Sequence, residues 1–154
     1  MPRKKSVNKD TVETVANTTF EVLPLLRKKL LRMDGVQAEH NMPMSQVQML
    51  AMLGESGALS VSEISKRLGI AKPNITPLID RLIDEGFVER RRDENDRRVV
   101  NVVLLPAGEE KLTSIRETIV RQVMRWTGTI PEKEFFELEH ALQTISTVLE
   151  SAQI

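Results

Sequence analysis

The chain has 154 residues, with 22 basic and 22 acidic side chains and a formal net charge of zero, so any positive charge that it uses must be concentrated locally. It has no cysteine, which excludes disulfides, thiolate metal sites and thiol redox switches. It also has no apolar run of roughly 18 residues and no signal-peptide pattern, so we expect a cytoplasmic protein that does not enter a membrane.

Helical periodicity dominates the first third of the chain. Residues 1–9 form a basic tail that we expect to be disordered, either solvated or touching phosphates. From Asp10 to about Met33, apolar residues recur every three or four positions, which predicts one long helix. Pro24 predicts a kink in it, and Asp34-Gly35 is expected to end it. A second helix is predicted from Pro43 to Leu53.

Residues 60–69 carry strong signals for the start and end of a helix. Ser60 and Glu63 fit a capping box, in which each side chain accepts a bond from the other's backbone N–H. Ile64 and Leu68 are four residues apart and share one face. Gly69 is the residue that most readily takes a left-handed conformation at a helix end.

After Gly69, another helix is predicted, starting near residues 71–73 and ending at Glu85-Gly86. Pro77 is expected to distort its first turn. Two helices joined by a short glycine-containing turn can place the second in a DNA major groove. Asn74 can pair with adenine, and Thr76 can bond a base or touch a thymine methyl. The alternative is that both side chains are merely solvated.

A hairpin is predicted next, with strands at Val88–Arg92 and Arg98–Leu105 and a turn at residues 93–96. Five arginines gather around its tip, at positions 90, 91, 92, 97 and 98. Arginine can enter a minor groove without base-specific bonds, and Asp96 could orient Arg98. The alternative is a charged edge that prevents aggregation between sheets.

Two more amphipathic helices complete the chain. The first is predicted from Ala107 to about Trp126, and the second follows a possible capping box at Thr129–Glu132. Together with the N-terminal helix, they carry more apolar surface than one small winged helix can cover. We therefore expect a two-fold dimer with interleaved terminal helices, the alternative being an intramolecular bundle.

Several segments together resemble the MarR family of bacterial transcription regulators. The similarity runs from about Thr11 to the C-terminus and is densest from Pro43 to Gly108. The matching segments are Ser45–Leu50, Gly57–Ile64, Arg67–Ile70, Thr76–Leu82, Glu85–Arg90 and Asp96–Arg98. Pro106 departs from the family's usual Leu-Thr-x-x-Gly. The resemblance implies a homodimer on a pseudo-palindromic operator, which in many members is released by a small aromatic or phenolic compound.

The sequence therefore predicts a mainly α (α+β) fold, a winged helix-turn-helix with a two-stranded wing. Residues 43–105 would form the DNA-binding lobe, and residues 10–34 and 107–151 the helical dimerisation region. The expected function is a repressor that binds double-stranded DNA, and the alternative is a winged helix that binds another protein. Residues expected to contact DNA are Ser60, Lys66, Lys72, Pro73, Asn74, Thr76, Arg81, Arg90, Asp96, Arg97 and Arg98.

Candidate residues for an effector pocket share adaptable or aromatic side chains. They are Met33, His40, Met42, Met44 and Trp126. Methionine at helical spacing is also common in a plain core, and His40 could equally lie in a solvated loop. Two widely separated histidines and the lack of a glycine-rich phosphate loop argue against an enzyme, a zinc site or a cofactor.

Overall fold

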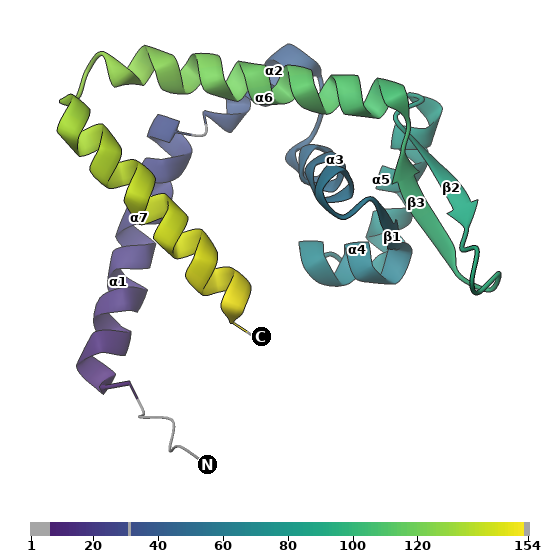
Figure 1. Cartoon of the computed structure of the whole chain (residues 1–154), viewed down its shortest axis with the longest axis horizontal. Helices are drawn as coiled ribbons and strands as arrows, with labels where there is room; N and C mark the ends of the chain where they lie inside the picture. Colours follow the sequence, from purple (N-terminus) through teal and green to yellow (C-terminus); the bar gives the residue numbers. More distant parts are fainter. Residues whose placement is uncertain (1–6, 31, 153–154) are drawn as a thin grey trace. The chain divides into compact units, whose positions relative to one another are not determined.

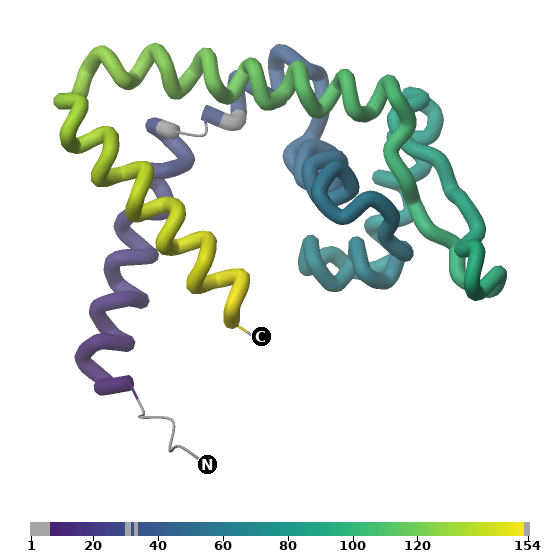
Figure 2. The backbone as a smooth tube through the Cα atoms, viewed as in Figure 1, coloured from purple at the N-terminus to yellow at the C-terminus, as the bar shows by residue number. Residues whose placement is uncertain are grey.

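The computed structural model describes residues 7–30 and 32–152, without the side chains of Leu30 and Met33 (Figures 1 and 2). The chain divides into two compact units. We call residues 33–119 the reader unit. The terminal unit combines the two ends of the chain, up to residue 32 and from residue 120 onward. In the terminal unit, Asn8 caps α1 (Lys9–Leu25) by accepting a bond from the Asp10 backbone N–H at 3.2 Å.

The prediction of one long N-terminal helix is wrong beyond Leu25. A π-helical segment, η1 (Leu26–Leu30), follows α1 directly and begins two residues after Pro24, whose missing N–H removes one helical hydrogen bond. A separate helix, α2 (Met33–His40), then occupies the stretch where Asp34-Gly35 was expected to end the structure. Val36 is fully buried in the core, and this burial outweighs the poor helix propensity of the neighbouring glycine.

The reader unit is built around one hydrophobic core. Its remaining elements are α3 (Met44–Ser56), β1 (Ala58–Ser60), α4 (Val61–Leu68), α5 (Lys72–Asp84), β2 (Val88–Arg92), β3 (Val100–Leu104) and the start of α6 (Pro106–Thr127). The core includes Leu50, Ile64, Ile75, Ile79 and Leu82, each with a relative exposure of 0%. Burying each such side chain contributes about 1.5–3 kcal/mol, which explains why the apolar faces of these helices meet.

The predicted local signals around α4 are confirmed. Ser60 Oγ accepts from the Glu63 backbone N–H at 3.3 Å, and Glu63 Oε2 accepts from the Ser60 backbone N–H at 2.8 Å. Gly69 ends α4 with φ of 64°. The second capping box is wrong: Thr129 Oγ1 donates to the Trp126 carbonyl at 2.7 Å, and α7 (Glu132–Ser151) begins after Pro131 without a side-chain cap.

The sheet has three strands where the sequence predicted two. The order is β1-β3-β2, fully antiparallel, and Figure 1 shows it beside α3, α4 and α5. Strand β1 has only three residues, too few for an alternating pattern, but Leu59 pairs with Val102 and both are buried. Strand β3 starts at Val100 and not at Arg98, because Val99 closes the turn by donating to the Asp96 carbonyl.

Close packing fixes the start of α6. A Cβ atom added at Gly108 would lie 2.1 Å from the Phe87 carbonyl oxygen, so only glycine fits there. Pro106 is the first residue of α6, a position where its missing N–H costs nothing. The predicted fold class, a winged helix-turn-helix with flanking helices, is confirmed. Within residues 7–30 and 32–152, no helix is long and apolar enough to cross a membrane.

Candidate nucleic-acid interface

The turn between α4 and α5 is held by hydrogen bonds on both sides. Ser65 accepts at its carbonyl from the Ile70 N–H at 3.2 Å, and its hydroxyl donates to the Ile70 carbonyl at 2.6 Å. Ile70 is half-buried and packs against the core. The angle between the two helices is therefore fixed by a partly buried loop rather than by a flexible linker.

Helix α5 buries one face and exposes the other. Ile75, Ile79 and Leu82 are buried, whereas the residues predicted to contact DNA lie on the exposed side, namely Lys72, Pro73, Asn74, Thr76 and Arg81. The Thr76 hydroxyl donates to the Lys72 carbonyl at 3.3 Å, so its oxygen can still accept a bond and its methyl stays available. Arg81 Nε pairs with Glu85 Oε1 at 3.2 Å.

Two of the predicted DNA-binding residues belong to α4 or its cap. Lys66 is exposed near the end of α4. The Ser60 hydroxyl donates to Glu63 Oε2 at 2.7 Å, so this side chain is engaged in the capping box. The Ser60 hydrogen bonds also lower the pKa of Glu63. The two residues therefore differ. The Lys66 side chain is exposed to solvent, whereas the Ser60 hydroxyl is already hydrogen-bonded to Glu63.

The predicted pairing of Asp96 with Arg98 is confirmed. Arg98 Nε donates to Asp96 Oδ1 at 3.1 Å, and Arg98 Nη2 donates to Asp96 Oδ2 at 3.1 Å. The Arg98 backbone N–H also donates to Asp96 Oδ1, at 3.0 Å. These bonds from Arg98 lower the pKa of Asp96, and the carboxylate raises the pKa of Arg98. The Arg98 side chain is 91% exposed, so its guanidinium is presented to solvent in a fixed direction.

Sequence reasoning missed a second carboxylate that orders the wing tip. Asp93 accepts from the backbone N–H groups of Asn95 at 2.9 Å and Asp96 at 3.0 Å, and from Asn101 Nδ2 at 3.0 Å. Bonds from the N–H groups of Asp96 and Asn95 lower the pKa of Asp93. An Asp two and three residues before the groups that it binds is a known turn signal, but the bond from Asn101 needs the paired strands.

The other wing arginines differ in their partners. Arg90 Nη2 pairs with Asp80 Oδ1 on α5 at 2.7 Å. Arg91 pairs with Glu89 on the same strand. Arg92 and Arg97 line a hollow at the wing tip with Asp93 and Glu94. The five arginines predicted as one cationic group thus fall into two sets. Arg90 and Arg91 lie along β2 and pair with acids on α5 and on β2, and Arg92, Arg97 and Arg98 lie at the tip.

The candidate effector residues are divided between the two units. In the reader unit, His40 Nε2 bonds Thr118 Oγ1 at 2.9 Å, Met42 is buried in the core, and Met44 packs against that core. Trp126 belongs to the terminal unit, where it lines a hollow with Lys28, Lys29, Arg32, Gln122 and Arg125. The Met33 side chain lies outside the described part of the chain.

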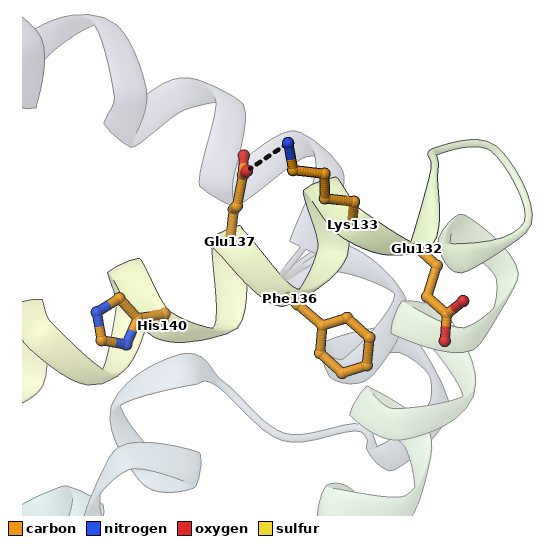
Figure 3. A pocket seen from close by; sticks show the side chains of 5 residues that line it. All are labelled: Glu132, Lys133, Phe136, Glu137 and His140. Atoms are coloured by element: carbon orange, nitrogen blue, oxygen red, sulfur yellow. Dashed lines mark ion pairs between the residues drawn. The ribbon is translucent and has the colours of Figure 1, made fainter.

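A second hollow of the terminal unit lies along α7. Figure 3 shows it, with Glu132, Phe136 and His140 around it and the ion pair between Lys133 and Glu137 drawn as a dashed line. Phe136 is 58% exposed, so an aromatic ring faces solvent on this helix. Among the described residues, no three His, Cys, Asp or Glu side chains lie close enough together to hold a metal ion.

Comparisons with known proteins agree on one family. The model of the MarR family matches residues 42–100, which include α4, α5 and most of the wing. An HTH-type transcriptional regulator of Bacillus subtilis (strain 168), YfiV, is 32% identical over 113 residues, covering 73% of this chain and 71% of that protein. The HTH-type transcriptional repressor MdtR of the same organism is 26% identical and covers 70% of this chain and 69% of its own length.

A solved structure extends the likeness to the flanking helices. A MarR family protein from Bacillus stearothermophilus superposes with a TM-score of 0.75 and 25% sequence identity, covering 95% of this chain and all of that one. The family model, the similarity to YfiV and the winged helix-turn-helix geometry are consistent with one family. The chain belongs to the MarR family and is a DNA-binding transcriptional regulator.

Proposed function

We propose that the protein is a dimeric repressor that binds a pseudo-palindromic DNA operator and releases it when a small anionic compound binds. The observation that carries the DNA-binding part is that two candidate DNA-contacting elements belong to one compact unit. The exposed face of α5 and the tip arginine Arg98 are ordered by core packing and by Asp96, within the same reader unit. Relatives named as repressors, such as MdtR, support the direction of regulation.

In this proposal the two elements read different grooves. Helix α5 enters the major groove, where Asn74 can pair with adenine and Thr76 can meet a thymine methyl; each base contact discriminates by about 1–3 kcal/mol. Arg98 enters the adjacent minor groove, where it senses groove width and negative potential. Acidic residues of the same face, including Asp84, limit non-specific attraction to phosphates, so binding depends on correct placement.

The dimer part of the proposal rests on apolar side chains that the terminal unit leaves in water. Val12, Val15 and Leu23 of α1 are 53%, 61% and 55% exposed, and Ile145 and Leu149 of α7 are 50% and 61% exposed. Monomeric proteins rarely leave such continuous helical stripes uncovered. A second copy of the same helices would cover them and would set two α5 helices about 34–36 Å apart, one turn of DNA.

The effector part rests on the hollow around Trp126. Its cavity volume is about 260 Å³, and four of its six described lining residues are cationic and none is acidic. In a chain of zero net charge, this concentration of lysine and arginine favours an anion. Trp126 offers a ring for stacking, and Gln122 Oε1 is buried without a partner among the described residues. The volume lies below the usual range of about 300–1,000 Å³, so a single-ring anion fits best.

The chain itself provides the probe for the effector. Trp126 is the only tryptophan and there is no tyrosine, so intrinsic fluorescence reports on this hollow. We expect benzoate to change the emission saturably and benzamide, its neutral counterpart, to have no effect. Arg125→Gln should remove the benzoate response, whereas Lys133→Gln, which changes the charge equally outside the hollow, should keep it. No saturable response to benzoate would refute the effector part and leave the DNA-binding part standing.

The DNA-binding part is tested by selection from a random duplex pool. The proposal expects enrichment of a two-fold symmetric sequence, bound with an affinity that falls by orders of magnitude over a few-fold rise in salt. A winged helix that binds another protein would enrich no sequence and would show little salt dependence. A cytoplasmic location follows from a function on chromosomal DNA.

A further inference from the structure

An ion pair joins α5 to strand β2 of the wing. Arg90 is the third residue of β2, and its Nη2 atom lies 2.7 Å from Oδ1 of Asp80, which is on the exposed face of α5. The other ion pairs of this face connect residues within four positions of each other, as in Arg81–Glu85 and Arg98–Asp96. The pair with Asp80 spans ten residues and two different elements.

The wing needs such a connection, because its backbone is held from one side only. The strand order places β2 at the edge of the sheet, with a ladder to β3 and none on its other side. Arg90 and the buried Val88 are two residues apart, so they point to the same face of the sheet, the face that packs on the helices. Arg90 therefore extends from the buried base of the wing towards α5.

The charge on Asp80 would otherwise oppose the proposed function. A carboxylate on the exposed face of α5 repels DNA phosphates, and pairing with a guanidinium neutralises it. The side chains of Arg90 and Asp80 are 39% and 50% exposed, so the pair contributes little to stability but sets a direction between two elements.

We propose that Asp80 and Arg90 are a positioning pair that fixes the wing against α5, so that Arg98 and the exposed face of α5 meet adjacent grooves together. Arg90 acts on DNA through this geometry and not by contact. The inference rests on the proposed function, because it concerns how an operator is read.

The sign of one substitution separates positioning from simple electrostatics. Asp80→Asn removes a negative charge from the DNA-facing surface, so a charge that only repels phosphates predicts tighter operator binding. Positioning predicts the reverse, a loss of roughly threefold to tenfold, the usual coupling between side chains in contact. Asp84→Asn is the matched control: it removes another exposed carboxylate of α5, one that has no ion pair among the described residues, and the variant should bind as tightly as wild type or tighter.

Double variants test whether the pair acts as a unit. Arg90→Gln should weaken binding as much as Asp80→Asn, and combining the two should weaken it no further. If Arg90 contacts a phosphate, Arg90→Gln will weaken binding in both backgrounds and lower the salt slope by about one per contact. In an Arg98→Ala background, Asp80→Asn should change affinity less than twofold, because the wing no longer reads the groove.

The measurement is fluorescence anisotropy on the selected operator at two salt concentrations, with circular dichroism to confirm that every variant is folded. Weaker binding by Asp80→Asn and non-additivity with Arg90→Gln support the inference. Wild-type affinity or tighter binding by Asp80→Asn overturns it, as does full additivity. A wild-type protein that binds no operator overturns the proposed function and the inference with it, so the two failures are distinguishable.

Discussion

Removing the wing-tip arginine tests how much of the binding energy the wing carries. The Arg98 side chain is 91% exposed and its ion partner is Asp96 two residues away, so Arg98→Ala removes no core contact. Surface substitutions of this kind change the free energy of unfolding by about 0.5 kcal/mol or less. The fold and the dimer should therefore survive, and the whole effect should appear in DNA binding.

The loss in affinity can be estimated from the contact that is removed. A hydrogen bond from a charged group contributes about 1.5–3 kcal/mol, and at the lower value two wings of a dimer lose about 3 kcal/mol. That corresponds to a roughly 150-fold weaker operator complex. If the guanidinium also neutralises a phosphate in each half-site, the slope of log affinity against log salt should fall by nearly 2 for the dimer.

The assay is anisotropy of a labelled operator titrated with wild-type and Arg98→Ala protein at several salt concentrations. Lys133→Gln serves as the control, since it removes one exposed positive charge from α7 of the terminal unit, which carries none of the residues proposed to contact DNA. An affinity of Arg98→Ala within twofold of wild type would refute the minor-groove role. A large loss accompanied by a lower melting temperature would instead place Arg98 in the structure of the wing.

Four further outcomes are expected. Asn74→Ala should change sequence preference by about 1–3 kcal/mol at one base position, read by repeated selection, whereas a uniform loss on all sequences would place this side chain on a phosphate. Gly108→Ala should destabilise the fold by about 1–3 kcal/mol in chemical denaturation, because its Cβ would overlap the Phe87 carbonyl; an unchanged midpoint would contradict the packing at the start of α6. Leu142→Asp should yield monomers in sedimentation, because it places a charge among the exposed apolar side chains of α7; an intact dimer would refute a dimer interface on this helix. The pKa of Asp96 is lowered in the folded protein by its bonds from Arg98. The ionised carboxylate should therefore stabilise the fold above the unfolded pKa of about 3.9, and this stabilisation should be lost only as pH falls through the lower folded pKa. An NMR titration of the Asp96 carboxyl with a midpoint above 4 would contradict this.

The parts of the candidate interface that depend on residues close together in the sequence were predictable. Two of these features join residues at most three apart, namely the capping box of Ser60 and Glu63 and the pairing of Asp96 with Arg98. The third, the left-handed conformation of Gly69, is a property of a single residue. Such contacts depend on backbone geometry that is already implied by the sequence spacing. The exposed and buried faces of α5 followed from helical periodicity for the same reason.

Contacts between distant residues were not predictable from spacing. The bond from Asn101 to Asp93 needs the register of the hairpin, and the pair of Arg90 with Asp80 needs the packing of β2 against α5. Helix α2 was missed because Gly35 suggested the end of a helix. Burial of Val36 stabilises α2, and this burial exists only in the folded core. Strand β1 was missed because three residues show no period.

The most direct test of the central claim is a footprint of the purified protein on the DNA upstream of its own coding region. Two readers carrying α5 and the wing should protect two symmetric half-sites centred about one helical turn apart, with protection fading as salt rises. Protection of a single unsymmetrical stretch, or of no DNA at low salt, would contradict the account.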